Sequence, residues 1–455
     1  MKNRFRALTT ACAAIAVGLP LYAENWTMYL RDSRHSSASL EASPIARDTV
    51  SILQPAWSTS LGNAVAAAPS ILGSMLYVGD WKGFFYGIDS AGGAVMWQNF
   101  VGMAPAPANP ICQPSLGVTG QATVTDSTVY VNGGDSAVYA FDRITGRQLW
   151  RVQVADPATG SYLWGGLTLS NHSLYTGVAS LGDCPIVRGV LVRIDLDDPQ
   201  HPLFQYVSPT DEAAGGIWST PAVDEATNTV YVTTGTGKQD PSRGLYGGTL
   251  LAMDATTLDI KGFFFLPTND LDHDIEWGSS PTLLETSDGT RMVVATAKDG
   301  NLWAVRRDDF QLLWMTNLCI GGDTPQAGYG SLSTPAFDGT YLYVGAGAVD
   351  PDDWDHRGSV YAINPLDGSV VWKQILTGPV IAPVTVANGV VFAASTAGLV
   401  TFDRTTGDLL WTDPARAMMY SQPIIADGVL YTSYVKGRIT AWQSPESSTI
   451  GSPVK

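Results

Sequence analysis

The sequence predicts an all-β fold, an eight-bladed β-propeller of four-stranded blades whose last blade is closed by the N-terminal strand. Two observations lead to this prediction. Short runs of alternating apolar residues are separated by clusters of Gly, Asp and Asn, a pattern typical of strands and turns. The pattern also returns at a spacing of about 40 to 60 residues, the range in which propeller blades repeat.

The clearest copy of the repeat spans residues 331–372. It predicts four strands, STPAFD, YLYVGA, SVYAIN and SVVW, with an insertion after the second. Five copies end in a Trp that lies eight residues after a fixed position, and two further copies are more divergent. We interpret the recurrent Trp as a packing residue between blades. Its five positions are Trp97, Trp150, Trp314, Trp372 and Trp411.

The final copy, LYTSYVKGRITAWQ at residues 430–443, stops after its third strand. We expect the missing strand to be PAWSTSL at residues 55–61, which puts Trp57 in the recurrent Trp position. Pairing the two chain ends in this way leaves no free sheet edge at the seam of the ring.

The N-terminus has a basic tip, an apolar run and a small-residue exit at Ala23. This predicts a secretory signal peptide at residues 1–23. Cys12 follows LTTA, which resembles a lipoprotein cleavage site, but the apolar run continues past it, so cleavage after Ala23 is favoured. We expect one propeller domain at residues 24–443 and a disordered tail at 444–455.

The predicted mature chain is acidic, because removal of the signal peptide takes the formal net charge from −16 to −19. This argues against a nucleic-acid partner. No other stretch approaches the roughly 20 apolar residues of a membrane span. The sequence contains no CxxCH motif for an attached c-type haem. We therefore expect a periplasmic or secreted protein.

The cysteines predict one disulfide. An oxidising compartment favours pairing, and Cys112 and Cys184 lie in loops on the same face of adjacent predicted blades. Cys319 leads into the sixth blade, well around the ring. We expect a Cys112–Cys184 disulfide and a free Cys319.

The long insertions fall in two loop classes that share one face of a propeller: the loops between second and third strands, and the loops that lead into the next blade. We expect function on this face, since the strands repeat and these loops do not. VYVTTGTG follows IWSTPAVD, PTNDLDHDIEWGSSP leads into the fifth copy, and VASLGDCPIVRG interrupts the third. With AKDGNLWAV, they resemble the quinoprotein alcohol dehydrogenases, which are eight-bladed propellers that bind pyrroloquinoline quinone and usually Ca²⁺.

The resemblance covers most of the mature chain through the repeats, and it implies a set of site residues. Trp218 corresponds to the Trp that floors the quinone, and Lys298 to a cation at the quinone oxygens. Asp272, in LDHD, corresponds to the catalytic aspartate. The other implied residues hold the cofactor or the metal: Arg188 (cofactor), Asp183 and Asp272 (metal), and Thr236 (both).

The sequence departs from the family at several of these positions. Asp183 replaces a metal-binding glutamate, and Thr236 replaces a metal-binding asparagine, with Lys238 two residues on. The family's adjacent Cys-Cys pair is reduced to Cys112-Gln113. Since Ca²⁺ takes six to eight oxygen ligands, these changes weaken the implied metal site, and an ammonium group could repel the ion or replace it.

The implied function is the oxidation of a small-molecule alcohol, with electrons passed to a separate acceptor such as a cytochrome or a quinone. Simpler interpretations stay open at each position: Trp218 as a core residue, Asp272 as part of a solvated or structural Ca²⁺ loop, and Lys298 as a turn lysine. Two other functions also stay open. One is a non-catalytic scaffold similar to the eight-bladed outer-membrane assembly factor, and the other is a degenerate quinoprotein that only binds a ligand.

Overall fold

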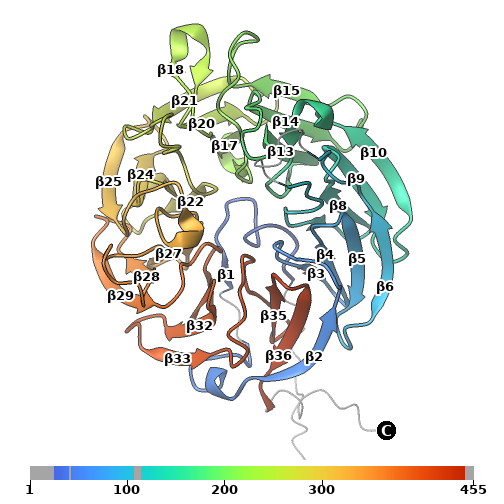
Figure 1. The fold of residues 1–455 in the computed structure, drawn as a ribbon, viewed down its shortest axis with the longest axis vertical. Coiled ribbons are helices and arrows are strands. Elements are labelled where there is room, and N and C mark those ends of the chain that lie inside the picture. Colours follow the sequence, from blue (N-terminus) through green and yellow to red (C-terminus); the bar gives the residue numbers. More distant parts are fainter. Residues whose placement is uncertain (1–24, 40–42, 107–113, 446–455) are drawn as a thin grey trace, which may run out of the picture.

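The computed structural model describes residues 25–39, 43–106 and 114–445. Eight antiparallel sheets are arranged around a central axis, in agreement with the predicted propeller (Figure 1). In seven blades the strands follow chain order from the axis outward, and in the eighth the outermost strand is the N-terminal β2 (Gln54–Ser60) (Figure 1).

Blade 1 comprises β3 (Ser70–Leu72), β4 (Met75–Gly79), β5 (Phe84–Asp89) and β6 (Val95–Phe100), and blade 2 comprises β7 (Thr123–Val124), β8 (Thr128–Asn132), β9 (Ala137–Asp142) and β10 (Gln148–Gln153). Blade 3 comprises β12 (Thr168–Ser170), β13 (Ser173–Ser180), β14 (Val190–Asp195) and β15 (Leu203–Tyr206). Blade 4 comprises β16 (Ala222–Asp224), β17 (Thr229–Thr233), β20 (Thr249–Asp254) and β21 (Ile260–Phe265).

Blade 5 comprises β22 (Thr282–Glu285), β23 (Arg291–Thr296), β24 (Asn301–Arg306) and β25 (Leu312–Asn317), and blade 6 comprises β26 (Ala336–Phe337), β27 (Leu342–Ala346), β28 (Gly358–Ile363) and β29 (Val370–Leu376). Blade 7 comprises β30 (Thr385–Ala387), β31 (Val390–Ser395), β32 (Gly398–Asp403) and β33 (Leu409–Thr412). Blade 8 comprises β34 (Ile424–Ala426), β35 (Val429–Tyr434), β36 (Arg438–Gln443) and β2 (Gln54–Ser60).

Short elements lie in the connections. They are β1 (Ala38–Ser39), β11 (Ser161–Tyr162), the hairpin of β18 (Gln239–Asp240) and β19 (Leu245–Tyr246), and single 3₁₀ turns at Val50–Ile52, Pro157–Thr159, Glu225–Thr227, Pro241–Arg243 and Pro325–Ala327. In the described part of the chain, no helix is long and apolar enough to cross a membrane.

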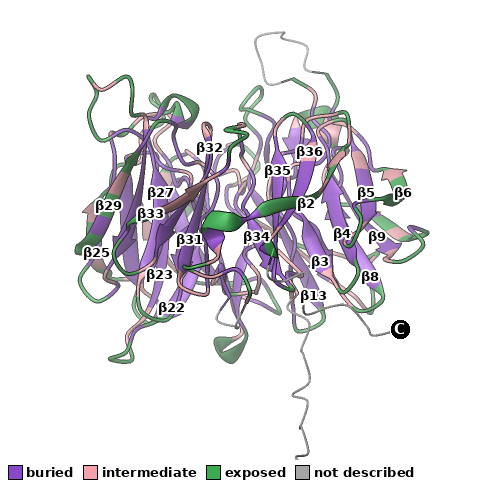
Figure 2. Ribbon diagram, turned by 90° about the horizontal axis from the view of Figure 1, so that it is seen from below, coloured by how far each residue is buried: buried purple, intermediate pink, exposed green. Residues whose placement is uncertain are grey.

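The N-terminal strand β2 closes the ring, as predicted. It pairs antiparallel with β36, and Trp57 lies opposite Ala441. The blades pack through buried apolar clusters, one of which joins blade 8 to blade 1 across this seam. Seen from the side, the buried residues follow the strands, while exposed residues gather on loops and outer strands (Figure 2).

The recurrent Trp joins neighbouring blades, which confirms its predicted packing role. The indole N–H of Trp314 in blade 5 donates to the carbonyl of Pro365 in blade 6, at 2.9 Å. Its ring packs against Gly368, whose φ of 73° puts it in the left-handed region. A Cβ at Gly368 would lie 2.6 Å from the ring, so this turn requires glycine. Trp57 repeats the contact at the seam, donating to the carbonyl of Ser90.

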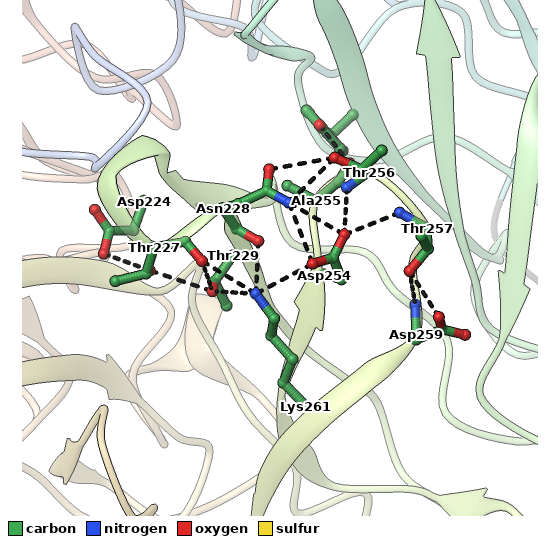
Figure 3. Close-up of polar contacts among 11 residues, drawn as sticks. Asp224, Thr227, Asn228, Thr229, Asp254, Ala255, Thr256, Thr257, Asp259 and Lys261 are labelled. Carbon is green, nitrogen blue, oxygen red and sulfur yellow. Dashed lines mark hydrogen bonds and ion pairs between the residues drawn. The ribbon is translucent and has the colours of Figure 1, made fainter.

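The face opposite the long loops is formed by tight, hydrogen-bonded turns. In blade 4, Lys261 Nζ donates to the carbonyls of Thr227 and Asn228 and lies 3.3 Å from Asp254 Oδ2 (Figure 3). Asp254 in turn accepts from the backbone N–H groups of the turn that follows it. The polar groups of this turn therefore bond to one another.

An N-terminal strap, residues 25–39, crosses the centre of the ring, which the sequence patterns did not reveal (Figure 1). It forms backbone hydrogen bonds with the innermost strands of blades 1, 2, 4, 5, 6 and 7 and ends as β1, parallel to β30. His35 of the strap is fully buried, and its Nδ1 lies 2.7 Å from the carbonyl of Pro281. The strap thus supplies partners for inner strand edges that would otherwise face the axis unpaired.

Candidate functional site

A cavity of about 460 Å³, here called the loop cavity, opens among the long loops of blades 3 to 6. Its walls come from the two loop classes that the sequence places on one face. The loops between second and third strands of blades 3, 4 and 5 contribute Asp183, Thr236 and Lys298. The lead-in loops of blades 3 to 6 contribute Trp164, Trp218, Asp274, Glu276 and Asp323 among others.

An ion-pair cluster forms the charged side of this cavity. Lys298 Nζ donates to Asp274 Oδ2 at 2.6 Å and to Glu276 Oε1 at 2.8 Å. The second carboxylate oxygen of Glu276 accepts from the backbone N–H of Thr236. Glu276 and Lys298 are buried, with 7% and 9% of their surface exposed, whereas the Asp274 side chain is 37% exposed. Asp274 is therefore the member of the cluster that a ligand in the cavity can contact most freely.

Burial and mutual charge set the protonation of this cluster. Burial, together with the nearby Asp274 carboxylate, raises the pKa of Glu276 to about 7, although Lys298 opposes the shift. Burial also lowers the pKa of Lys298, but the Glu276 and Asp274 carboxylates outweigh it and the pKa is raised. On the neighbouring loop, burial and then the charge of Asp274 raise the pKa of Asp183. Lys298 therefore stays protonated, and its ammonium is the shared counter-charge of Asp274 and Glu276.

Trp218 lies beside this cluster. Its ring is partly exposed and lines the cavity, with Lys298 Nζ 5.9 Å from the ring centroid. Its N-terminal neighbour Ile217 is buried in the core that blade 4 shares with blade 3, so the backbone under the ring is fixed. A flat aromatic face beside a held cation is an arrangement that can bind a planar anion.

Four of the residues implied by the family resemblance meet at the loop cavity, namely Asp183, Trp218, Thr236 and Lys298. Asp272 and Arg188 are not among the residues that line it. Asp272 is exposed at the tip of its loop. Arg188 stacks on Tyr206, with its guanidinium carbon 3.9 Å from the ring centroid, and donates to the carbonyl of Ser208.

The position of Asp272 follows from a local turn. Asp270 and Ile275 form an isolated antiparallel bridge, so residues 271–273 are turned outward at its tip. The chain then returns to the cavity with Asp274 and Glu276, two residues apart. The sequence signal for these two was a pair of acidic residues directly ahead of the apolar Trp277, whereas the resemblance assigned the catalytic role to the first Asp of LDHD.

The metal implied by the resemblance does not fit the side chains as they stand. No three His, Cys, Asp or Glu side chains within residues 25–39, 43–106 and 114–445 lie close enough together to hold an ion. The ammonium of Lys298 lies between the Asp274 and Glu276 carboxylates, where it supplies their counter-charge. Lys238 pairs instead with Glu212, at 2.8 Å, and does not line the cavity.

The predicted disulfide stays a prediction, because Cys112 lies outside the described residues. Cys319 is free and buried, as expected. Burial raises the pKa of its thiol to about 11, so it is unreactive near neutral pH.

Fold and site together define a PQQ-repeat propeller with a charged, Trp-floored cavity on its loop face. A family model of such repeats, described as outer membrane protein assembly factor BamB, matches residues 37–197 and 276–450, and the chain belongs to this family. It is also 24% identical to a polyvinylalcohol dehydrogenase from a Pseudomonas species, over 85% of this chain and 70% of that protein.

Two other similarities agree with the resemblance to quinoprotein alcohol dehydrogenases. The chain is 22% identical to the quinoprotein alcohol dehydrogenase PedH of Pseudomonas putida, over 86% of this chain and 82% of that protein. A europium-containing methanol dehydrogenase shares the fold, with a TM-score of 0.76 and 16% identity, over 92% of this chain and 98% of that structure.

Proposed function

We propose that this protein is an exported quinoprotein that oxidises an alcohol in the loop cavity. The observation that carries the proposal is the juxtaposition of the Trp218 ring with Lys298, which two carboxylates hold 5.9 Å from the ring centroid. Pyrroloquinoline quinone is planar and anionic, and when bound it accepts the two electrons of the alcohol. The similarity to the Pseudomonas enzymes supports this assignment.

Each side chain has a defined part. Trp218 would offer its ring to the planar quinone, and Lys298 would offer the N–H that it does not donate to Asp274 or Glu276. Asp274, the more exposed carboxylate of the cluster, accepts the proton of the substrate hydroxyl. Glu276, bonded to Thr236 and Lys298, keeps the ammonium in place. Asp274 takes this role in preference to Asp272 because only Asp274 lines the cavity.

The substrate class is an alcohol, and polymer-borne secondary alcohols are included because one relative is a polyvinylalcohol dehydrogenase. Electrons leave to a separate acceptor, a cytochrome or a quinone. The predicted signal peptide at residues 1–23 supports export to the periplasm or beyond.

The test is reconstitution of the purified protein with pyrroloquinoline quinone, followed by its absorbance spectrum and by dye reduction across primary and secondary alcohols. Trp218→Ala is expected to weaken quinone binding, whereas Trp354→Ala, at a ring 74% exposed and outside the cavity lining, is the matched control. Because Lys298 already lies between the carboxylates, we expect binding without added Ca²⁺, and parallel titrations with Ca²⁺ check this. A protein that binds no quinone in either condition refutes the enzymatic proposal.

A second candidate is a non-catalytic scaffold, favoured by the description of the matching family model as an outer membrane assembly factor. Failure of quinone binding together with co-purification of outer-membrane assembly components is the result expected of a scaffold.

A further inference from the structure

The loop face carries the same four-residue turn twice. Residues 270–273, in the lead-in loop of blade 5, are Asp-Leu-Asp-His, and residues 353–356, in the insertion of blade 6, are Asp-Trp-Asp-His. They are called the blade-5 turn and the blade-6 turn below. Neither turn contributes a residue to the lining of the loop cavity, so the proposed chemistry leaves both of them without a part.

The two turns are held by the same hydrogen bonds. In the blade-5 turn, Asp270 Oδ1 accepts from the backbone N–H of Asp272 at 2.9 Å, and Asp270 Oδ2 lies 2.8 Å from His273 Nδ1. Asp353 makes the corresponding bonds in the blade-6 turn, at 3.1 Å and 3.0 Å. The first and fourth residues of each turn therefore fix the backbone between them.

The second residue of each turn is apolar and exposed. The side chain of Leu271 is 54% exposed and that of Trp354 is 74% exposed. Neither side chain takes part in the hydrogen bonds that hold its turn. One exposed apolar residue needs no explanation, but two that are presented by the same fixed turn on one face indicate a contact surface for another protein.

Trp354 is held by its own loop. The guanidinium carbon of Arg357 lies 5.0 Å from the Trp354 ring centroid and 4.8 Å from that of Tyr329. Arg357 Nε and Nη2 also donate to the carbonyl of Ala327, at 3.1 Å and 2.9 Å. Because the indole stacks on a guanidinium that is itself fixed, little side-chain freedom is lost when a partner packs on its exposed surface.

Both turns adjoin the loop cavity. The blade-5 turn runs directly into Asp274, which lines the cavity. The blade-6 turn is joined through Arg357 to the lead-in loop of blade 6, whose Asp323 also lines the cavity. This loop is close to the blade-5 turn as well, since the pKa of His273 is raised first by its hydrogen bond to Asp270 and further by nearby carboxylates that include Asp323. A partner seated on the two turns would lie beside the cavity.

The surface around the two turns is acidic. Residues 267–277, 317–331 and 347–358 contain nine Asp and Glu residues but a single Lys or Arg, which is the stacked Arg357. The whole chain has a formal net charge of −16. Such a surface attracts a positively charged partner and repels an anionic one. The exposed carboxylates are Asp272, Asp323, Asp350, Asp352 and Asp355.

We propose that Leu271, Trp354 and these exposed carboxylates form the docking surface for a positively charged, electron-accepting protein. The inference rests on the proposed function, because it names the kind of acceptor that the loop cavity serves. Trp354 packs on an apolar patch of the partner, and lysines around that patch pair with the carboxylates. Two molecules of a one-electron acceptor take up the two electrons of each alcohol, and the two protons are released to solvent. A small quinone acceptor would need neither the exposed apolar side chains nor the charge.

The first experiment measures binding to the full chain without quinone, by calorimetry. The probe is mitochondrial cytochrome c, a basic haem protein, and the matched probe is its succinylated form, in which the lysines carry carboxylates. We expect the native form to bind at an ionic strength of about 10 mM and more weakly at about 150 mM, because salt screens the exposed charges. The succinylated form should not bind at either ionic strength.

Variants of the blade-6 turn test the surface itself. Trp354→Ala should lower the affinity for native cytochrome c about 10-fold or more, as expected of a central aromatic contact. Asp352→Asn combined with Asp355→Asn should lower it about 3- to 10-fold and flatten its salt dependence. Ile144→Ala, at a side chain 55% exposed in the turn between β9 and β10 on the opposite face, is the matched control and should change nothing. Thermal unfolding checks that each variant is folded.

The second experiment uses the reconstituted enzyme and compares the rate of cytochrome c reduction with that of dye reduction. The ratio should fall about 10-fold in Trp354→Ala and stay unchanged in Ile144→Ala. The inference is overturned by absence of binding of native cytochrome c, by equal binding of both forms, or by an unchanged affinity in folded Trp354→Ala. Reduction of a soluble quinone without reduction of cytochrome c overturns it as well. Binding that depends on Trp354 in a protein that takes no quinone cofactor refutes the proposed function and leaves the docking surface standing.

Discussion

Two cavities of the propeller differ in how the repeat builds them. A cavity of about 330 Å³ on the propeller axis, the axial cavity, is lined by the segments that lead into the inner strands of all eight blades, and none of its lining residues is charged. The loop cavity is instead built from unrelated insertions of blades 3 to 6 and contains four carboxylates and one lysine. A charge repeated in every blade would face like charges across the narrow axis, which is unfavourable. Charged chemistry therefore lies off the axis, in segments such as Asp274–Glu276 that do not repeat.

The largest effect is expected on turnover, when a carboxylate of the loop cavity is removed. Asp274→Asn removes the carboxylate that accepts the substrate proton, and kcat should fall by about 10²- to 10⁴-fold while quinone binding is retained. Asp272→Asn is the matched control two residues away and should keep wild-type turnover. Steady-state dye reduction distinguishes the two, and a severe loss in Asp272→Asn alone would return the catalytic role to Asp272.

The next effect is on stability and tests the ion-pair cluster. Lys298→Met leaves the buried Glu276 carboxylate without its ammonium partner, and removal of one member of a buried pair costs about 3 to 5 kcal/mol. Adding Glu276→Gln to Lys298→Met should recover part of this loss, because the remaining buried charge is removed. Urea denaturation of the wild type, of Lys298→Met, of Glu276→Gln and of the double variant measures these losses. Additive losses in the double variant would contradict a pair that depends on its mutual charge.

A smaller effect is expected from pH at the strap. Burial lowers the pKa of His35 to about 4 from its ordinary 6.5, and the hydrogen bond to Pro281 only partly opposes this. The His35 imidazole is thus protonated more readily in the unfolded chain than in the folded chain. The contribution of neutral His35 to the free energy of unfolding is therefore fully present above pH 6.5. That contribution is lost as pH falls toward 4 and amounts to about 2 kcal/mol between pH 7 and 5. Denaturation of the wild type and His35→Gln over this range should show a shallower pH dependence in the variant.

Much of the fold follows from local sequence, because each blade is specified by short alternating runs and its turns. Residues 331–372 predicted four strands, and β26 to β29 are found there. Trp57 and residues 55–61 were recognisable as the missing strand because they resemble the outer strand of the other blades. The strap was not recognisable: its hydrogen bonds come from the backbone of residues 25–39, and backbone pairing leaves no required side-chain pattern.

For the site, the sequence by itself determined which loops face one another, since loop class and blade order follow from the repeat. It also determined the residue types there, including Trp218, Lys298 and Asp183. Only the tertiary structure decided that Asp274 and not Asp272 lines the cavity, because Asp272 is exposed at the tip of the turn that the bridge between Asp270 and Ile275 closes. The axial cavity was likewise decided by assembly, since its neutral lining exists only when eight blades bring their inner segments together around the strap.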